Sequence, residues 1–595
     1  MTHRYKPATS APKLRALPFT GLRSAFADGY GSRDLRSDIL AGMVVGVVAL
    51  PLSMALAIAV GVPPQHGLYT AIVAGMVVPL LGGSRFQVTG PTAAFVVILA
   101  PIVSRFGIGG LLLAGAMAGA ILLAMGLFRL GRLIQFIPHP VTTGFTAGIG
   151  TVIGVLQLKD LLGLQPSRSP DHFVERLQTF WQARSTARLS ELGIGLATLA
   201  VLIFLPKVWR RVPAPLVALP AAAIGAWWLH RNGVDVSTIG SRFHTVIDGI
   251  RVDGIPRLPP LPVKPWALGS ELTFDLHTLR VLLPSAIAIA LLGAIESLLS
   301  AVVADGMAGT KHDPDAELLA LGVGNVVCPF FGGIAATGAI ARTATGIRYG
   351  SKSPISTMVH AVVVLAAVLA LAPLISYLPM SALAALLMLV AWNMSEAKHF
   401  FHMVRVAPKS DVAVLLTCYF LTVVFDMVVA VTAGMILAAF LFMRRMAEVA
   451  SVQLVEDLHS HLEVKLPKDT VLYEVNGPLF FGAAETAMDA FKAIGARMRV
   501  LILNMAAVPA MDITGLVALE SALLRLRQQG VLTLITGVQP QPAGVLNKAG
   551  VQEEPGRIQF CATLDQAAQA ASAHVARHAP LPASHGRPQS GFSAG

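Results

Sequence analysis

The amino-acid sequence predicts a polytopic α-helical membrane protein that carries a small α/β domain near its C-terminal end. Of its 595 residues, 54% are hydrophobic and only 13% are charged, about half the charged share of a soluble protein. Apolar runs as long as a membrane span recur along the first three quarters of the chain. After Arg445 the hydropathy falls, and short apolar runs alternate with helical patterns.

The formal net charge of +12 does not require a nucleic-acid partner, because the placement of the basic residues accounts for it. They gather at the chain ends and in short loops that flank apolar runs, which predicts that both termini are cytoplasmic. The residues on which this rests are Arg4, Lys6, Lys13, Arg15, Arg23, Arg33, Arg36, Arg444 and Arg445. Nucleic-acid binding is therefore not expected.

The cysteines and the chain ends limit the remaining possibilities. Cys328, Cys418 and Cys561 lie far apart, so they indicate neither a disulfide framework nor a metal site. The first apolar run, from Ile39, is long enough to span, so it is expected to be a membrane helix and not a cleavable signal peptide. Residues 1–37 and 577–595 are expected to be disordered tails.

The spans are predicted from apolar runs, since crossing a membrane takes roughly 20 apolar helical residues. The predicted helices are Ile39–Val60, Gly67–Leu81, Gly109–Phe128, Val141–Leu162, Leu192–Leu205, Leu216–Leu229, Val281–Ala304, Ile355–Ile375, Leu378–Trp392 and Val412–Phe442. The last run is long enough for two spans, with a break near Asp426. The polar, proline-rich stretch from His230 to Asp275 separates two membrane halves and is expected to resist a single conformation.

Two apolar segments are interrupted in a way that ordinary spans are not. Ser84–Phe95 is broken by Gly90-Pro91, and Cys328–Thr343 is broken by its glycines. Each pattern predicts an extended piece that leads into a short helix, and the two lie at matching places in the two halves. Such a pair points to the binding site of a transporter. Ordinary kinked helices or re-entrant loops are the structural alternative.

The segment from His459 to Val575 reads as one small α/β domain. The expected strands are Val471–Val475, Val500–Asn504 and Val531–Ile535, and the expected helices are Glu485–Ala496 and Gly515–Gln529.

Sequence motifs in this order resemble the sulfate permease (SulP) family of anion transporters, and the C-terminal part resembles a STAS domain. The motifs are Leu50-Pro-Leu-Ser-Met-Ala55, Gly67-Leu-Tyr69, Gly82-Gly-Ser-Arg85, Gly90-Pro91, Gly293-Ala-Ile-Glu-Ser297, Gly338-Ala-Ile-Ala-Arg-Thr343 and Ser353-Pro-Ile-Ser356. The likeness covers about residues 35 to 575.

The resemblance implies a transport domain, residues 38–446, followed by a STAS domain, residues 459–575. It implies fourteen membrane segments in two inverted repeats of seven, divided into a core and a gate domain. It also implies an elevator-like motion and a homodimer. An unidentified protein partner of the STAS domain is expected.

Within the family, three stretches look closest to a bacterial transporter of C4-dicarboxylates such as succinate, fumarate and aspartate. They are Met54–Ala57, Gly90–Phe95 and Trp392–Glu396. This implies a location in the bacterial inner membrane and proton-coupled uptake of C4-dicarboxylates. Sulfate and then bicarbonate are the alternative substrates.

In this family the third and tenth segments are half-helices whose N-termini point at each other. A helix N-terminus offers free N–H groups and roughly half a positive charge, which suits an anion. The substrate-binding residues implied here are Thr92, Ala93, Ala94, Ala339, Ile340, Ala341 and Arg342, with Pro51 and Ser53 from the first span. The charges sum to roughly +2, the size of a dianion. Arg342 has a structural alternative, namely snorkelling or pairing, and Leu52 stands where many relatives have a polar residue, which leaves the substrate open.

Glu296 is the only ionisable side chain between Val281 and Ala304. A charge at mid-membrane costs about 2.5–3.5 kcal/mol, so this carboxylate should bind a cation, pair or take up a proton. Ser300 lies on the same helical face and is its candidate partner. We expect Glu296 and Ser300 to couple transport to protons, with sodium as the second choice. A Glu296 bonded to backbone or paired with Arg342 is the structural alternative.

Several other features have structural readings. Asp305 and Asp426 are expected to be caps or loop anchors, and Gly42/Gly46 and Gly115/Gly119 are expected to mark close helix packing. Thr514, in the STAS loop before a helix, is a candidate regulatory phosphorylation site, although an N-cap role is the simpler reading.

No phosphate-binding GxxxxGK[ST] loop, nucleophile–base pair or metal cluster is evident, so neither an enzyme nor a cofactor is expected. A membrane-anchored STAS sensor or scaffold is the alternative from another functional class. A scaffold would tolerate Glu296→Gln and Arg342→Ala, whereas a transporter would lose uptake with at least one of them.

Overall fold

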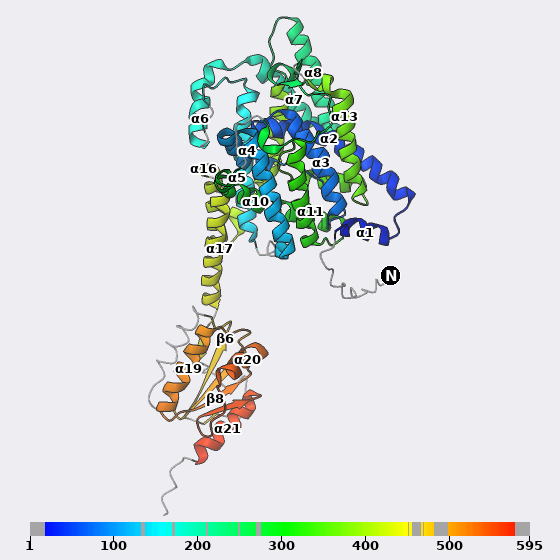
Figure 1. Ribbon diagram of the computed structural model, residues 1–595. Helices are drawn as coiled ribbons and strands as arrows, with labels where there is room; N and C mark the ends of the chain where they lie inside the picture. The colour runs from blue at the N-terminus through cyan, green and yellow to red at the C-terminus, as the bar shows by residue number, and fades with distance from the viewer. Residues whose placement is uncertain are drawn as a thin grey trace, which may run out of the picture. The chain divides into compact units, whose positions relative to one another are not determined.

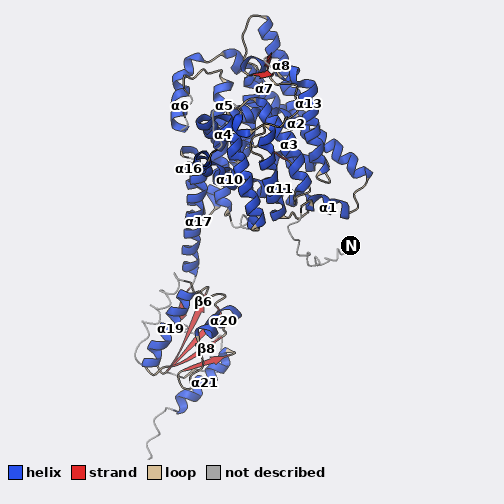
Figure 2. Ribbon diagram, in the orientation of Figure 1, coloured by secondary structure: helices blue, strands red, loops and turns tan. Residues whose placement is uncertain are grey.

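The computed structural model describes residues 18–132, 137–168, 170, 173–209, 212–247, 250–268, 275–425, 427–449, 451–454, 466–467, 469–480 and 498–577. The chain divides into two compact units, Met1–Ile436 and Leu437–Gly595. The first is a bundle of helices (Figure 1), and the longer strands belong to the second (Figure 2).

The first half of the membrane unit follows the predicted order of spans. Its long helices are α2 (Ser32–Val60), α3 (Pro64–Leu81), α4 (Ala93–Leu127), α5 (His139–Leu161), α7 (Leu189–Val208) and α8 (Ala214–Arg231). Helix α4 is two helices joined at Gly107, whose φ of 66° and ψ of −171° break the helical path. The second part of α4 matches the span predicted from Gly109.

The second half repeats this sequence of elements. Its helices are α10 (Leu276–Ala308), α11 (Pro314–Val327), α12 (Ile340–Arg348), α13 (Ile355–Ile375), α14 (Met380–Ser395), α16 (Lys409–Val424) and α17 (Met427–Val449). The run from Val412 is two helices, as predicted, while Asp426 itself lies outside the described residues. Helix α11 was not predicted, because its 14 residues are too few for a span of ordinary length.

Among the described helices, eight are long and apolar enough to cross a membrane on their own. The long helices given above for the first half make seven segments when α4 is counted as two, and those given for the second half also number seven. The family resemblance implies the same number. Strand β1 (Thr89–Gly90) precedes α4 and strand β4 (Thr337–Gly338) precedes α12, and the same Thr-Gly dipeptide forms both. They pair antiparallel, Thr89 opposite Gly338 and Gly90 opposite Thr337, which fits two inverted repeats.

The membrane helices form two groups. Helices α2, α3, α4, α10, α11, α12 and α13 pack against one another, and this group corresponds to the expected core domain. Helices α5, α7, α8, α14 and α16 pack in a second group, which corresponds to the expected gate domain. Fewer contacts join the groups, mainly through α2 and α4.

The paired glycines explain several close helix crossings. A Cβ at Gly42 would lie 2.7 Å from the Val359 Cβ, and one at Gly119 would lie 2.5 Å from the Val326 backbone nitrogen. Gly46 is equally tight against Val363 of α13, whereas Gly115 has ordinary contact distances. The expectation of close packing is confirmed at Gly42, Gly46 and Gly119, and Gly115 is less crowded.

Part of the N-terminal segment, expected to be disordered, is a short helix, α1 (Thr20–Ala27), and α2 begins already at Ser32. Arg85 explains the difference: its Nε donates to the Ser24 Oγ (2.7 Å) and its Nη2 lies 2.6 Å from an Asp28 carboxylate oxygen. Residues 1–17 lie outside the described part.

The polar stretch between the halves is more regular than predicted. It contains α9 (Ile239–Arg242), a hairpin of β2 (His244–Ile247) and β3 (Ile250–Asp253), and a 3₁₀ turn, Pro265–Ala267. The Ile239 N–H donates to the Leu378 carbonyl at 3.0 Å, and the Gly240 N–H donates to the Ser376 carbonyl at 2.8 Å. These backbone bonds to the turn between α13 and α14 hold the stretch despite its prolines.

Shorter helices complete the membrane unit. They are α6 (Phe173–Gln182), the 3₁₀ turns Ala183–Thr186 and Cys328–Phe331, and α15 (Ala397–Val406), which joins α14 to α16.

The second unit contains a five-stranded sheet in the order β5-β6-β7-β8-β9. The strands are Ser451–Leu454, Thr470–Asn476, Val500–Ala507, Leu532–Thr536 and Ile558–Cys561, and the helices are α19 (Ile513–Gln528), α20 (Pro540–Ala549) and α21 (Leu564–Arg577). Strand β5 is antiparallel and the others are parallel. The three predicted strands and the helix from Gly515 are confirmed. The helix predicted at Glu485–Ala496 and the tail beyond residue 577 lie outside the described residues.

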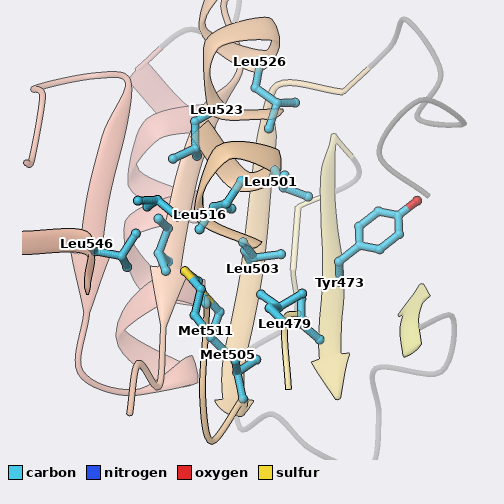
Figure 3. Packing of buried hydrophobic residues seen from close by; sticks show 14 of the residues in the cluster. Tyr473, Leu479, Leu501, Leu503, Met505, Met511, Leu516, Leu523, Leu526 and Leu546 are labelled. Carbon is cyan, nitrogen blue, oxygen red and sulfur yellow. The ribbon is translucent and has the colours of Figure 1, made fainter. Parts of the chain in front are cut away.

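Alternating residues of β7 bury the two faces of this sheet, as the period of two requires. Leu501 and Leu503 pack toward α19 in one hydrophobic cluster (Figure 3), whereas Val500 and Ile502 belong to a second cluster with α21. Parallel strands covered on both faces read as continuous apolar runs, which is why β6, β7 and β8 could be recognised in the sequence.

Candidate functional site

The two interrupted segments meet at the short β1–β4 pair in the middle of the first helix group. Helix α4 begins directly after β1 and helix α12 directly after β4. The Ala339 N–H donates to the Val88 carbonyl at 2.8 Å, and the Val88 N–H donates to the Thr343 Oγ1 at 2.9 Å. The prediction of an extended piece leading into a short helix is confirmed for both segments. The first N–H groups of α4 and α12 have no acceptor within their own helix.

Arg342 lies at this crossing and is almost wholly buried, with 2% of its surface exposed. Its Nη2 donates to the carbonyl oxygen of Pro91, the residue before the N-cap of α4. Its Nε and Nη1 are also buried, and neither has a hydrogen-bond partner among the described residues. A buried guanidinium that keeps two N–H donors unpaired is costly unless another group accepts from them.

Glu296 of α10 contacts the same corner of the chain from another helix. The Thr92 hydroxyl, at the N-cap of α4, donates to the Glu296 Oε2 at 2.8 Å. Thr92 therefore caps α4 with its backbone only, while its side chain holds the carboxylate next to the helix N-terminus. Arg342 and Glu296 are close enough for their charges to attract.

Ser300 is not the hydrogen-bond partner of Glu296, contrary to expectation. Its Oγ donates to the Thr343 Oγ1 at 3.4 Å, so Ser300 ties α10 to the first turn of α12. The i, i+4 relation places Glu296 and Ser300 on one face of α10, but the Ser300 hydroxyl bonds to Thr343 of the neighbouring helix α12 instead. The hydroxyl that hydrogen-bonds to Glu296 belongs to Thr92.

The remaining implied binding residues surround the crossing. Ala93 and Ala94 are buried at the start of α4, Ala339 is the N-cap of α12, and Ile340 and Ala341 follow as exposed residues. The four alanines have small side chains, which leave the neighbouring amide groups accessible, whereas Ile340 is large and exposed.

Pro51 and Ser53 are buried in α2, which packs against both α4 and α12. The Ser53 Oγ has no hydrogen-bond partner in the described part of the chain. That the first span lines the site from a third direction stays a prediction.

Sequence reasoning missed a second layer of polar residues behind the crossing. The Gln87 Nε2 donates to the Ser297 Oγ (2.5 Å), and the Asn325 side chain both accepts from the Ala336 N–H (2.8 Å) and donates to the Ala336 carbonyl (2.9 Å). These bonds fix the extended pieces, whose backbone groups have no helix to satisfy them. Single amides inside otherwise apolar runs were the available signal.

Other predicted positions have local roles. Asp305 anchors the loop after α10, because its carboxylate accepts from the Thr310 hydroxyl (2.9 Å) and from the backbone and ring nitrogens of His312 (2.9 and 2.7 Å). In the second unit the N-cap of α19 is Asp512, whose Oδ1 accepts from the Gly515 N–H at 2.8 Å. Thr514 is exposed and lies inside the helix, so the N-cap reading of Thr514 is wrong.

Comparison with known proteins shows which family the chain resembles. A model of the sulfate permease family matches residues 35–418, and a model of the STAS domain matches residues 461–567. A putative sulfate transporter of Bacillus subtilis is 39% identical over 89% of this chain and 97% of its own. The bicarbonate transporter BicA of Picosynechococcus is 30% identical over 82% of this chain and 86% of its own.

The fold also matches a solved structure. Murine Solute Carrier 26 family member A9, an anion transporter in the inward-facing state, superposes with a TM-score of 0.80 at 17% identity over 96% of each chain. At this identity the match concerns the fold, namely a multi-helix transmembrane unit followed by a STAS domain.

Proposed function

The chain belongs to the sulfate permease family, and on that premise we propose that it carries a compact oxyanion, sulfate first and bicarbonate second, across the membrane. The binding site is the crossing of the α4 and α12 N-termini beside Arg342. The proposal rests above all on one observation: Arg342 is buried with Nε and Nη1 unpaired. An oxyanion at the crossing supplies the acceptors that these two donors lack.

The charges near the crossing favour a proton-coupled dianion. Two helix N-termini and Arg342 contribute roughly +2, and an ionised Glu296 lowers the sum to roughly +1. A dianion is then matched when Glu296 carries a proton, whereas a monoanion is matched when it does not. Sulfate entry therefore brings a proton with it, and bicarbonate entry needs none.

The shape of the charge distribution favours a compact anion over a C4-dicarboxylate. Arg342 and Glu296 both bond to one corner of the chain, Pro91–Thr92, while succinate carries two carboxylates separated by two carbons. The names of the relatives, a putative sulfate transporter and a bicarbonate transporter, support the same order. The expectation of a C4-dicarboxylate substrate is tested below by offering succinate beside the two smaller anions.

Movement of the site follows from the two helix groups. The crossing lies wholly within the first group, so a rigid displacement of that group against the second would carry the bound anion without rebuilding its site. Such an elevator-like motion, in a homodimer with cytoplasmic termini in a bacterial inner membrane, is part of the proposal.

Uptake into proteoliposomes tests the substrate. Labelled sulfate, bicarbonate and succinate are offered separately, with and without an inward proton gradient. We expect sulfate uptake that the gradient increases, and bicarbonate uptake that it does not. Uptake of succinate alone would overturn the substrate assignment. Absence of uptake of all three, with folded protein in the vesicles, would favour the scaffold reading.

A further inference from the structure

A hollow in the second helix group lies apart from the α4–α12 crossing. It has a volume of about 460 Å³ and is lined by residues of α5, α14 and α15, with Tyr419 of α16. This is within the usual size range of small-molecule sites. None of the residues at the α4–α12 crossing lines it, so anion binding does not explain it.

Small residues on facing helices create the hollow. Gly150 and Gly154 of α5 and Ala391 of α14 line it, and a Cβ added at Gly154 would meet only the Ala391 Cβ, 3.9 Å away. Two of the three hydroxyls of the lining, Thr151 Oγ1 and Tyr419 OH, lie 3.3 Å apart and hydrogen-bond to each other, and the third, Ser395 Oγ, donates to the Trp392 carbonyl at 2.8 Å. The space that remains is apolar and suits a hydrocarbon.

The length of the hollow matches one leaflet of a bilayer. Its lining follows α5 from Ala147 to Leu158, and that stretch of helix rises roughly 16 Å. The hydrocarbon core of a membrane is about 30 Å thick, so each leaflet, and each acyl chain in it, is about 15 Å long. The lining ends at Phe400 and Phe401 of α15, where the chain turns between two membrane helices.

Helix α15 provides a basic face beside this end of the hollow. Lys398, His402 and Arg405 recur at i, i+4 and i+7, so they share one face of the helix, and all three are exposed. Neither Lys398 nor Arg405 forms an ion pair with any residue in the described ranges. Basic residues beside an apolar slot at membrane depth are suited to an anionic headgroup.

We propose that the hollow holds an acyl chain of an anionic phospholipid whose phosphate lies on the Lys398–Arg405 face of α15. The apolar lining receives the chain, and the basic face selects an anionic over a zwitterionic headgroup. A second copy of this chain could also cover an apolar hollow, but it would not explain the basic face next to it.

Native mass spectrometry of the full-length protein, titrated with phosphatidylglycerol and with phosphatidylcholine, tests this. Wild-type protein is expected to retain phosphatidylglycerol in preference to phosphatidylcholine. Gly154→Leu fills the hollow and should lower retention of both lipids by about tenfold. Lys398→Gln with Arg405→Gln should leave phosphatidylcholine binding unchanged and reduce the preference for phosphatidylglycerol by roughly thirtyfold, since each basic residue near a membrane contributes about fivefold.

Matched variants separate these effects from misfolding. Gly225→Leu adds the same side chain to α8 at a position with no atom within 4 Å of the new Cβ, and Lys207→Gln removes a cation from the end of α7. Both should bind lipid like the wild type. Equal retention of phosphatidylglycerol by Gly154→Leu and Gly225→Leu would overturn the proposal. So would a Gly154→Leu protein that binds lipid normally but loses its dimer, since a second copy would then cover the hollow.

Discussion

Two charged side chains of opposite sign contact the same corner of this membrane protein. Arg342 donates to the Pro91 carbonyl, and Glu296 accepts from the Thr92 hydroxyl. A carboxylate beside an anion site repels the anion unless it is protonated. Protonation of Glu296 and binding of the anion beside Arg342 should therefore favour each other. This mutual dependence is the physical basis for symport of a proton with the anion.

Glu296→Gln should remove the pH dependence of sulfate uptake. In the wild type, uptake is expected to rise as the pH falls, because protonation of Glu296 takes away a negative charge next to the anion. Glutamine keeps the hydrogen bond to Thr92 and is neutral at every pH, so the apparent sulfate KM should become nearly constant. The measurement is KM against pH in proteoliposomes.

The control for this variant is Glu175→Gln, which neutralises an exposed glutamate of α6. It should reproduce the wild-type pH profile. A profile that keeps its full slope in Glu296→Gln would remove Glu296 from proton coupling.

At the scale of elements, glycine decides how closely α4 and α11 approach. A Cβ at Gly119 would lie 2.5 Å from the Val326 nitrogen and 2.8 Å from the Gly322 oxygen. Backbone atoms cannot move aside as a flexible side chain can, so the helices would have to separate.

Gly119→Ala is expected to destabilise the membrane unit by about 1–3 kcal/mol, the usual cost of overpacking. Thermal unfolding followed by size-exclusion chromatography in detergent measures the loss as a lower melting temperature. Gly225→Ala, whose new Cβ meets nothing within 4 Å, should melt like the wild type. Equal melting temperatures for the two variants would show that the α4–α11 crossing can accommodate an added methyl group.

The elements that the sequence predicted well are those with a strong local signal. Long apolar runs gave the spans, and Gly90-Pro91 and Gly338 marked the two interrupted segments at the site. Helix α11 was missed because it is short and because Asp315 and Glu317 lie in its first turn. Those acids are buried in the fold, where the Glu317 Oε2 accepts from the N–H groups of Gly83 and Ser84 at 2.9 Å each.

The hydrogen-bond partners of the side chains at the site were harder to predict from the sequence. Ser300 and Glu296 share a face of α10, which made them obvious partners, yet Ser300 bonds Thr343 of α12 and Glu296 is held by Thr92. These partners lie on helices whose approach is set by tertiary packing, and helical periodicity carries no information about that approach. The same reason hid the contact of Asn325 with Ala336 across the turn after α11.

At the scale of the whole molecule, the chain consists of two compact units with separate cores. The sheet of the second unit is buried through its own clusters, with Leu503 of β7 exposed by only 1%. Stability should therefore be divided between the units rather than shared over the whole chain.

Leu503→Ala should lower only one of two unfolding transitions. Truncating a buried leucine typically costs 2–5 kcal/mol, through lost burial and the cavity left behind. In scanning calorimetry of the full-length protein, the transition of the STAS unit should move to a lower temperature while that of the membrane unit stays in place. A parallel shift of both transitions would mean that the units unfold as one.

Initial sulfate uptake by Arg342→Gln, compared with Arg348→Gln at the exposed end of the same helix, tests most directly where the anion binds. Both variants lose one positive charge from α12, but only Arg342 has buried donors at the crossing. Losing a charge-assisted hydrogen bond of about 1.5–3 kcal/mol should reduce uptake by roughly ten- to a hundredfold. That loss is expected in Arg342→Gln alone. Near-normal uptake by correctly inserted Arg342→Gln protein would contradict the placement of the anion at the α4–α12 crossing.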